Sequence, residues 1–563
     1  MTPRAGLCES SQAVLPHSGL SAPAARLSID IRRFPWIRRL AADYAFDFGR
    51  VADFYAGDPA DPSAWGDAIA RTQRYPRQRD AIADVLLAQQ RRRGAPPESI
   101  AAAHQLRNDR TVAILTGQQA GLFGGPLFTL LKAMTALRLA ERLKTEHGVA
   151  AVPIFWIDAE DHDWDEVKSC GILDADLTFR SIALGNPAGA HELPVARVCL
   201  DASAAAACAE LEATLQATEF TPELLNDLRK AYHNGAGMAD AFAQFVESVL
   251  GPRGLVMYDS SDPAAKPLVA GLFAREIEHA GETSRLATEA GAALQARSYH
   301  AQATPHEGSV ALFQLNGGRQ AIRVEDGTFI VGEHRESKDA LLDRVRQSPQ
   351  QFSPNVLLRP LVQDTLFPTV CYVAGPNELA YLAQLSRVYR AFEIPMPLMY
   401  QRASATLLDS NAVRFLSRHD FPLEALRAQD EAALNALLES QLPPSVEASL
   451  QDALRVITER MDVLATEVPQ IDPTLEGATR STLTRMHDDL KKLHAKIIQA
   501  AKRKDETLRR QFKHAQAQAF PGGHPQEREI GFVYFLNKYG PSLVDRLGDE
   551  LPLEMGTHWV LTV

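Results

Sequence analysis

The sequence predicts an α/β protein built on a parallel sheet with inserted connecting segments, together with an α-helical antiparallel coiled-coil domain. Two observations predict this fold class. Between positions 111 and 158, a short apolar run, a long helical segment and a second apolar run follow one another, which is the order of a βαβ unit. From position 445 onward, apolar residues recur at alternating spacings of three and four, on two arms joined by a proline-containing turn.

The first apolar run is TVAIL (111–115), the helical segment is LFTLLKAMTALRLAERLKTE (127–146), and the second run is VPIFWID (152–158). Strands joined in this way are parallel, and their crossover is right-handed. GLVMYD and TVCYVAG are predicted to form further strands of the same sheet. Ligands of open α/β sheets bind beyond the carboxyl ends of the strands. The loops that follow the first two runs are therefore expected to face one crevice.

The chain of 563 residues is longer than one hydrophobic core usually organises, so we expect several domains. We expect a flexible leader (1–25), the α/β core (26–440), the coiled-coil domain (441–520) and a C-terminal segment that packs back on the core (521–563). Two insertions, about 166–250 and 264–350, interrupt the core. The first is expected to contain the strands RSIAL and ARVCL, and the second a small antiparallel sheet from VALFQL, GRQAIRV and GTFIVG.

Composition excludes several functional classes. A net charge of −11 argues against general nucleic-acid binding. The five cysteines form no C-x-x-C pair, which fits neither a disulfide framework nor a zinc ribbon and favours a reducing cytoplasm. No segment approaches the roughly 18 consecutive apolar residues of a membrane span, and the N-terminus lacks an apolar signal core. We therefore expect a cytoplasmic protein that binds neither membranes nor nucleic acids.

The loop TGQQAGLFGGP (116–126) is the first candidate site. It matches neither G-x-G-x-x-G nor the P-loop pattern, yet its glycines would let backbone N–H groups approach a ligand. A proline at the first position of the next helix would place a helix N-terminus, which favours anions, beside them. The alternative is a tight structural turn. The candidate binding residues are Gly117, Gln118, Gln119, Gly121, Gly124, Gly125 and Pro126.

The second candidate is DAEDHD (158–163), which offers Asp158, Glu160, Asp161, His162 and Asp163 as catalytic residues. Crowded carboxylates can coordinate a metal, act as general acid and base, or hold an ammonium group. The spacing matches no zinc signature, and the identity of any metal stays open. Helix capping by one aspartate is the structural alternative. One cap explains one acid, and crowding the others raises the pKa of at least one of them, which favours a functional site.

Weaker candidates lie further along the chain. AGPNELAY (374–381) follows a third strand, and Arg359 and Arg402 could neutralise a carboxylate or phosphate. An ordinary Gly-Pro turn and solvated arginines are the alternatives. The candidate binding residues here are Gly375, Pro376, Asn377, Glu378, Tyr381, Arg359 and Arg402.

The coiled-coil arms differ in length. The first carries Leu450, Leu454, Ile457, Met461 and Leu464, and the second begins with Leu483, Met486 and Leu490 and runs to about residue 518. Part of the longer arm therefore needs another partner. A second copy of the chain is the simplest one, so we expect a homodimer through the coiled coil.

Four long motifs together resemble the bacillithiol biosynthesis cysteine-adding enzymes, a family of cysteine ligases. They are TGQQAGLFGGPLFTLLKAMTALRLA, VPIFWIDAEDHDWDEV, AGPNELAYLAQL with RASATLL after it, and PGGHPQEREIGFVYFLNKYG. The resemblance extends from about residue 30 to the C-terminus. It implies a Rossmann-like core with connecting insertions and a coiled-coil domain that dimerises.

The resemblance also implies a reaction, in which the carboxyl of L-cysteine is joined to the amine of glucosaminyl-malate. The glycine loop and DAEDHD would line the active cleft, where the acids would hold the cysteine ammonium or deprotonate the attacking amine. Arg359 or Arg402 would meet the malate carboxylates. ATP with Mg²⁺ is the co-substrate to expect, without a tightly bound cofactor.

Two other interpretations stay open. One is a different carboxylate–amine ligase or nucleotidyl-transferring enzyme on the same fold. The other is a non-catalytic dimeric coiled-coil scaffold. The acid-rich DAEDHD loop argues against the scaffold, because a site without function would not need to keep such crowded charges.

Overall fold

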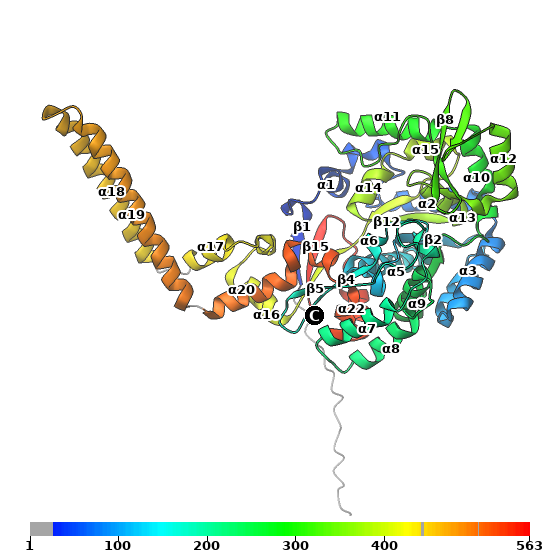
Figure 1. Cartoon of the computed structure of the whole chain (residues 1–563), viewed down its shortest axis with the longest axis horizontal. Helices are drawn as coiled ribbons and strands as arrows, with labels where there is room; N and C mark the ends of the chain where they lie inside the picture. The colour runs from blue at the N-terminus through cyan, green and yellow to red at the C-terminus, as the bar shows by residue number, and fades with distance from the viewer. Residues whose placement is uncertain (1–25, 441–443, 505) are drawn as a thin grey trace, which may run out of the picture.

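The computed structural model describes residues 26–440, 444–504 and 506–563, so the leader expected at 1–25 lies outside the described residues (Figure 1). A five-stranded parallel sheet lies at the centre of the core, in the order β13-β12-β2-β3-β6. Its strands are β2 (Val112–Gln118), β3 (Ala151–Ile157), β6 (Val256–Asp259), β12 (Thr369–Ala374) and β13 (Leu398–Gln401).

Helices cover both faces of this sheet, which explains why its strands are apolar without interruption. Val112 and Ile114 of β2 pack with α2 (Pro62–Arg74) and α5 (Leu127–His147) on one face. Ala113 and Leu115 point the other way and pack in the cluster that holds α3 (Arg79–Arg93) and α4 (Pro97–Gln105). The β2–α5–β3 unit is the crossover that the sequence predicts, and it brings the ends of β2 and β3 side by side.

The first insertion, between β3 and β6, contains a β-hairpin and three longer helices. They are β4 (Ser169–Leu173), β5 (Phe179–Ala183), α7 (Ser203–Thr214), α8 (Thr221–Ala231) and α9 (Met238–Leu250). The expected strand ARVCL is wrong, because this segment begins with the 3-10 turn Val195–Arg197. The turn donates the N–H groups of Val195 and Ala196 to the carbonyls of Asp161 and Ala159, at 2.7 and 2.8 Å. It therefore supports the acidic loop instead of extending a sheet.

The second insertion forms the antiparallel sheet that the glycine-punctuated runs predict, in the order β10-β9-β8-β7-β11. Its strands are β7 (Ser309–Leu315), β8 (Arg319–Glu325), β9 (Thr328–Val331), β10 (His334–Glu336) and β11 (Phe352–Pro354). Helices α10 (Ala270–Glu278), α11 (Glu282–Ala296) and α12 (Lys338–Gln347) accompany it in the upper part of Figure 1.

A three-stranded sheet joins the two ends of the described chain. Strand β15 (Thr557–Thr562) lies between β1 (Arg26–Asp30), to which it is antiparallel, and β14 (Ser404–Leu408), to which it is parallel. Before β15, helices α21 (Gln526–Glu529), α22 (Phe532–Tyr539) and α23 (Ser542–Glu550) pack along α5. The last segment of the chain thus lies against the central βαβ unit.

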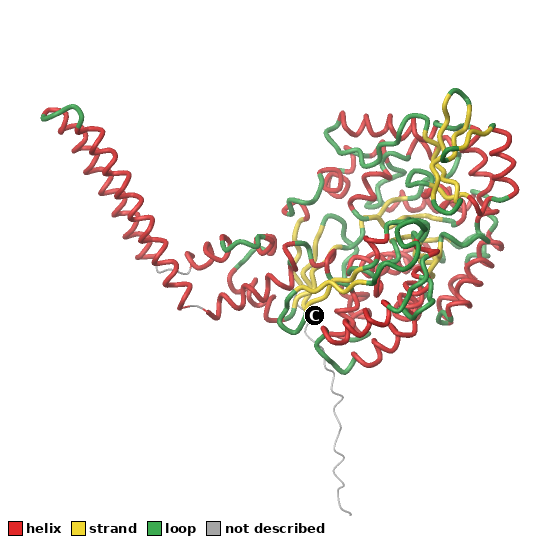
Figure 2. Tube along the Cα trace, in the orientation of Figure 1, coloured by secondary structure: helices red, strands yellow, loops and turns green. Residues whose placement is uncertain are grey.

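The antiparallel hairpin of α18 (Pro444–Glu467) and α19 (Leu475–Lys504) projects away from the core (Figures 1 and 2). Thr458 of α18 and His487 of α19 are 2.9 Å apart, from Oγ1 to Nε2, across the hairpin.

The rest of the second arm forms α20 (Glu506–Ala519), which packs on α16 (Ser410–His419). Phe512 of α20 is fully buried, and its ring contacts Phe415 and Phe421. This end of the arm, for which we expected a second copy as partner, is covered by the same chain.

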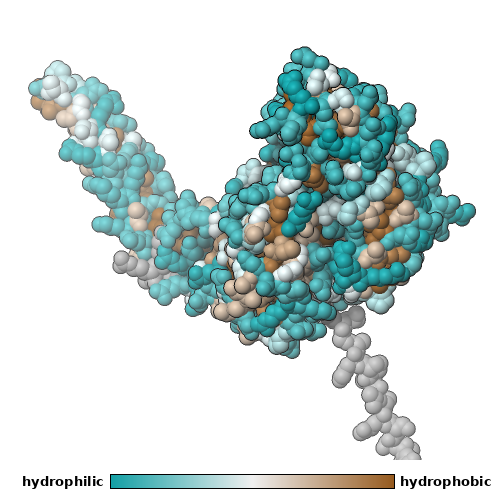
Figure 3. All heavy atoms as spheres, turned by 45° about the vertical axis from the view of Figure 1, so that its right-hand side comes forward, coloured by the Kyte–Doolittle hydropathy of each residue, from teal (hydrophilic) through white to brown (hydrophobic). Residues whose placement is uncertain are grey.

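The surface seen in Figure 3 is mostly polar, and most of the exposed large apolar side chains lie in the hairpin or its turn. In the described residues, no helix has both the length and the apolar composition needed to cross a membrane. Polar side chains cover most of the face in Figure 3, with apolar patches on the core and along the hairpin. The exposed large apolar side chains include Val456, Val463, Leu464, Ile471, Met486 and Leu493, all in the hairpin or its turn.

Candidate active site

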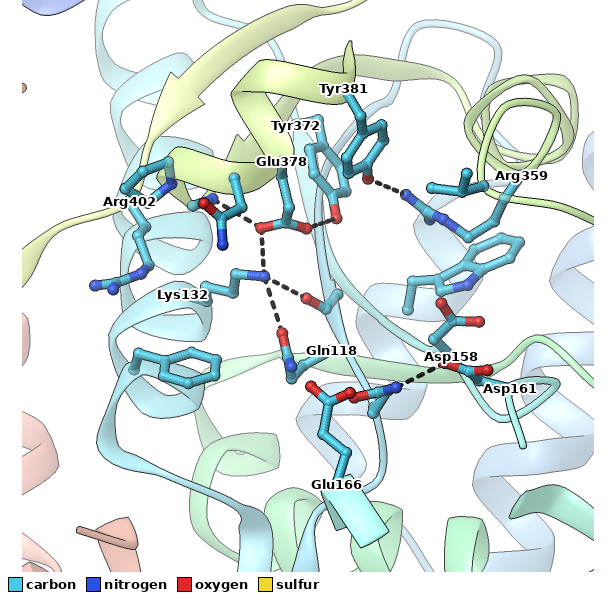
Figure 4. Close-up of a pocket in the computed structure, with 18 of the residues that line it drawn as sticks. Gln118, Lys132, Asp158, Asp161, Glu166, Arg359, Tyr372, Glu378, Tyr381 and Arg402 are labelled. Atoms are coloured by element: carbon cyan, nitrogen blue, oxygen red, sulfur yellow. Dashed lines mark hydrogen bonds and ion pairs between the residues drawn. The ribbon is translucent and has the colours of Figure 1, made fainter. Parts of the chain in front are cut away.

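A cavity of about 760 Å³ lies beyond the carboxyl ends of β2, β3 and β12, where open α/β sheets bind ligands. Segments distant in sequence line it: the two loops of the βαβ unit, α5, the segment after β11, α14 (Pro376–Leu382) and α21. Figure 4 shows the charged side chains that point into it. The predicted residues in its wall are Gly117, Gln118, Gln119, Asp158, Asp161, Arg359, Gly375, Pro376, Asn377, Glu378, Tyr381 and Arg402.

A buried ion pair occupies one side of the cavity. Lys132 Nζ of α5 lies 2.6 Å from Glu378 Oε2, and it donates to Gly117 O and Gln118 Oε1 at 2.7 and 3.2 Å. Glu378 also accepts bonds from the Tyr372 hydroxyl and the Gly375 N–H, both at 2.7 Å. The three N–H groups of the ammonium all have acceptors (Figure 4). The pair thus ties the glycine loop, α5 and the start of α14 together.

The environment shifts the pKa of both members of this pair. Burial lowers the pKa of Lys132, although Glu378 acts in the opposite direction. Burial would raise the pKa of Glu378, but the charge and hydrogen bond of Lys132 outweigh it and lower that pKa. The Glu378 carboxylate is therefore ionised at neutral pH, and the ammonium beside it compensates its charge.

Arg359 is held on the opposite side. Its guanidinium donates to the Tyr381 hydroxyl at 3.0 Å and to Gln363 Oε1 at 3.3 Å. It also lies over the rings of Trp156 and Tyr372, at 5.7 and 5.8 Å from their centroids. Arg359 is only 8% exposed, so its orientation is fixed by these contacts before any substrate enters.

Carboxylates form a third wall, shown at the lower right of Figure 4. Asp161 accepts a bond from Gln119 Nε2 at 2.7 Å, and Arg319 Nη1 lies 3.7 Å from it. Burial raises the pKa of Asp158, and the neighbouring acids Asp161 and Glu160 add to this rise. In the part of the chain that the structure describes, no hydrogen bond or ion pair engages the Asp158 carboxylate. Asp158 is thus an acid of this wall that is available to a substrate, with the charge of Arg359 acting to lower its pKa.

The other three residues of DAEDHD do not line the cavity. Glu160 is buried, 2.5 Å from Lys266 Nζ, and accepts a bond from Ser353 Oγ at 3.1 Å. Asp163 caps the short helix α6 (Trp164–Val167) through the N–H of Glu166, as the structural alternative predicts. The side chain of His162 is 62% exposed. These three therefore have structural or surface positions in this structure, and their assignment as catalytic residues stays a prediction.

The glycine loop has a different role from the one we expected. A Cβ at Gly117 would lie 2.7 Å from the carbonyl oxygen of Trp156, and one at Gly124 would lie 2.4 Å from the ring of Phe532. The N–H groups of Gly124 and Gly125 bond to carbonyls of the loop itself. Gly117 lines the cavity and lets β2 and β3 pack closely, whereas Gly124 and Gly125 lie outside it and Gly124 lets the loop pack against α22. Gly121 and Pro126 line a neighbouring groove.

The N-terminus of α5 is not open to an anion. The N–H of Leu127 donates to the carbonyl of Ile530 at 2.8 Å, and Pro126 forms a β-bridge with Gly531. The C-terminal segment thus covers the position where a phosphate would sit in a P-loop protein. This helix N-terminus therefore does not fit the phosphates of ATP.

No group of three or more His, Cys, Asp or Glu side chains in the described ranges is placed to hold a metal ion. DAEDHD therefore supplies no preformed metal cluster there. Its two cavity-facing acids, Asp158 and Asp161, are left as candidates for binding an ammonium group or accepting a proton.

Two family models together match nearly all of this fold. "Bacillithiol biosynthesis BshC, N-terminal Rossmann-like domain" matches residues 27–403, and "Bacillithiol biosynthesis BshC, C-terminal coiled-coil domain" matches 405–563. The chain belongs to the BshC family. The match confirms the predicted fold class, a Rossmann-like core and a helical coiled-coil domain.

Relatives in the BshC family match along almost their whole length. A Salinibacter ruber protein is 35% identical over 530 residues, covering 93% of this chain and 96% of its own. Proteins of Koribacter versatilis and Symbiobacterium thermophilum are each 32% identical, covering 92% of this chain and 97% and 96% of their own. Each carries the name "Putative cysteine ligase BshC".

Several residues of this BshC-family cavity were not predicted from the sequence. Lys132 had a detectable signal, since it is the single charge in the apolar run LFTLLKAMTAL at 127–137. The others were not singled out: some lie within the quoted motifs or the predicted strands, and the rest lie in distant segments that only the fold brings to the strand ends. These other residues are Phe128, Trp156, Glu166, Phe313, Arg319, Pro354, Asn355, Val356, Tyr372, Arg528 and Glu529.

Proposed function

We propose that this protein is a cysteine ligase of bacillithiol biosynthesis, which joins the carboxyl of L-cysteine to the amine of glucosaminyl-malate. The observation that carries this proposal is the match to relatives named as cysteine ligases over more than nine-tenths of both chains. A cavity with oriented arginines and an unengaged aspartate supports it, because both substrates bear carboxylate and ammonium groups.

The reaction forms one C–N bond and breaks one C–O bond. The sugar ammonium must lose one proton to become a nucleophile and a second as the amide forms. The carboxylate oxygen leaves with an activating group. Asp158, whose pKa burial raises, is suited to accept a proton from the amine. Holding both reactants in one cavity contributes through proximity and orientation.

Arg359 is suited to a carboxylate of the malate group. Its guanidinium is fixed by Tyr381 and Gln363 and faces the cavity. Arg402 also lines the cavity, but its guanidinium is 2.6 Å from Glu527 Oε1 in a buried pair. Arg402 therefore shapes the wall, and Arg359 is the better candidate for substrate binding.

We propose ATP with Mg²⁺ as the co-substrate that activates the carboxyl, because amide formation in water requires such a step. The N-terminus of α5 does not fit its phosphates, so we derive no step through it. The test is mass spectrometry of the purified protein with L-cysteine and glucosaminyl-malate, with and without Mg-ATP. A cysteinyl amide formed only with Mg-ATP is the expected result. Product formed equally without it would overturn the role of ATP, and no product in either sample would count against the ligase.

We further propose that the protein acts in the cytoplasm as a homodimer through its coiled coil. Val456 and Val463 of α18 lie seven residues apart, as do Met486 and Leu493 of α19, and all four are at least 39% exposed. A spacing of seven is the repeat of a coiled-coil seam. The hairpin therefore has an apolar stripe that α18 and α19 do not cover themselves, and a second hairpin would bury it.

A further inference from the structure

A smaller groove of about 240 Å³ adjoins the main cavity. It lies between the glycine loop, the β4–β5 hairpin and α21, and it shares Gln119, Phe128, Glu166 and Arg528 with the main cavity. It has about one-third of the main cavity's volume, so it suits a single small amino acid better than a sugar conjugate. The two reactants of an amide ligase need adjoining sites of this kind.

The common rim of the two spaces carries both signs of charge. Arg528 and Glu529 come from α21, and Glu166 comes from α6. In the described part of the chain, the Arg528 guanidinium forms no hydrogen bond or ion pair, unlike those of Arg319, Arg359 and Arg402. The nearby Glu527 is already engaged by Arg402. The rim thus offers a carboxylate a guanidinium that has no hydrogen-bond partner among the described residues. For an ammonium group it offers the carboxylate of Glu529 and that of Glu166, which also accepts a hydrogen bond from Gln119.

Apolar side chains lie in one part of the groove, its floor, beside Ser169 and Ser181. Val167 and Cys170 are 1% and 3% exposed there, and the ring of Phe179 forms one side. No side chain fits at two glycines: a Cβ at Gly171 would lie 2.1 Å from Glu529 O, and one at Gly531 would lie 2.3 Å from Cys170 Sγ. Such a floor accepts a short side chain, and aromatic rings make favourable contacts with sulfur.

The helix that carries Arg528 is held firmly in place. Gln526 bonds through its side chain to the N–H and the carbonyl of Leu407, at 2.8 and 2.7 Å. Glu527 accepts bonds from Arg402 and from Ser404 Oγ, and the N–H of Gly531 donates to Gly171 O at 2.8 Å. Contacts of the residues on both sides of Arg528 therefore fix its backbone, so its side chain extends from a fixed position at the rim.

We infer that this groove is the subsite for L-cysteine, with Arg528 binding its carboxylate, Glu166 and Glu529 facing its ammonium group, and the thiol directed to the floor. The inference rests on the proposed ligase function. It places the reacting carboxyl at the rim, next to the main cavity, where the amine of the larger substrate would attack it.

The test is calorimetric binding of L-cysteine and of glucosaminyl-malate to the full-length protein and two variants. Ser181→Leu fills the groove, and Arg528→Gln removes the guanidinium. Both should raise the Kd for L-cysteine by about tenfold or more. Ser181→Leu should leave the Kd for glucosaminyl-malate within about twofold, and Arg528→Gln, which also borders the main cavity, should raise it by less than it raises the Kd for L-cysteine. Cysteamine, which lacks the carboxylate, should bind the wild type and Arg528→Gln equally. Ser417→Leu and Arg418→Gln on the exposed face of α16 are matched controls.

A wrong L-cysteine subsite and a wrong ligase function would give different results in these experiments. If the wild type makes the amide and both variants bind L-cysteine like the wild type, the subsite is wrong and the ligase stands. If the wild type neither binds L-cysteine nor makes the amide, both fail. Thermal melting checks whether Ser181→Leu folds. If it does not, the L-cysteine affinity of Arg528→Gln, a substitution at an exposed position, tests the subsite alone.

Discussion

Individual side chains of the cavity have two kinds of role. Some hold the walls together, as Lys132 and Glu378 do through a buried pair with further hydrogen bonds. Others, such as Asp158, are left unengaged in the described residues and face the space where substrates would bind. Substitutions in these two groups should therefore affect different measurable quantities.

Replacing Lys132 with methionine should lower the free energy of unfolding by about 1–3 kcal/mol, because the Glu378 carboxylate, whose side chain is 21% exposed, then loses its counter-ion. Urea denaturation measures this loss. Lys144→Met on an exposed position of the same helix is the control and should change stability by less than about 0.5 kcal/mol. Equal effects of the two variants would show that the pair does not stabilise the fold.

Asp158→Asn should remove the acid limb of the pH–activity profile. Burial raises the pKa of Asp158 above its ordinary value of 3.8, so wild-type kcat/KM should fall as pH decreases through that raised value. Asparagine cannot titrate, and the variant should show a low, flat profile over the same range. The exposed variant Asp165→Asn should keep the wild-type limb. An unchanged limb in Asp158→Asn would assign the titration to another group.

The residues that the sequence could predict are those next to strand ends. Asp158 and Gln118 follow neighbouring parallel strands, so their proximity follows from the βαβ order alone. Tyr372 and Arg528 could not be placed in this way, because they reach the site through contacts with distant segments. His162 and Asp163 were predicted from residue type, but the chain turns after Asp161 and directs them elsewhere.

At the scale of elements, α21 connects the C-terminal segment to the cavity. Its Glu527 forms a buried pair with Arg402 and accepts a bond from Ser404 Oγ, which lies 2.7 Å from His558 Nδ1 of β15. Burial would raise the pKa of Glu527, but Arg402 outweighs it and the pKa falls to about 2. Helix α21 has only four residues, and it is therefore held in the cavity wall by this ion pair and not by a large buried apolar surface.

Glu527→Gln should destabilise the protein by about 3 kcal/mol at pH 7, which corresponds to the shift from 4.5 to about 2 in the pKa of Glu527. Because folding lowers the pKa of Glu527, its carboxylate stabilises the folded protein fully at pH values above its ordinary pKa of 4.5. This stabilisation is lost as the pH falls toward the pKa of about 2 in the folded state. The difference between the variant and the wild type should thus shrink below about pH 4.5. Denaturant titrations at several pH values check this, and a pH-independent difference would contradict it.

The sequence also predicted some elements better than others. The central strands and α5 were predictable because long apolar runs alternate with a strongly helical segment. The short strand β13 has no such pattern around it, and ARVCL is apolar but follows Pro194, which favours a turn. The sequence pattern at the end of the second coiled-coil arm predicts that the heptads continue. Instead, α20 packs on α16, because its Phe512 contacts Phe415 and Phe421 in a separate aromatic cluster.

The projecting hairpin is the part of the molecule through which we propose that two copies assemble. If they do, Leu493→Glu should convert the homodimer to a monomer, because it places a charge in the exposed apolar stripe. Light scattering after size-exclusion chromatography measures the mass. Thr484→Glu, an exposed change on a different side of the same helix, should leave the dimer intact. A monomeric wild type would exclude dimerisation through this stripe.

We propose that the cavity at the ends of β2, β3 and β12 is the active site of a cysteine ligase. This is tested by the rate of cysteinyl amide formation from L-cysteine and glucosaminyl-malate by the wild type and Asp158→Asn, followed by mass spectrometry. The wild type should form the product, and the rate with the variant should be about 100-fold lower or more, in the range expected for losing a general base. Equal rates for the two proteins would contradict it.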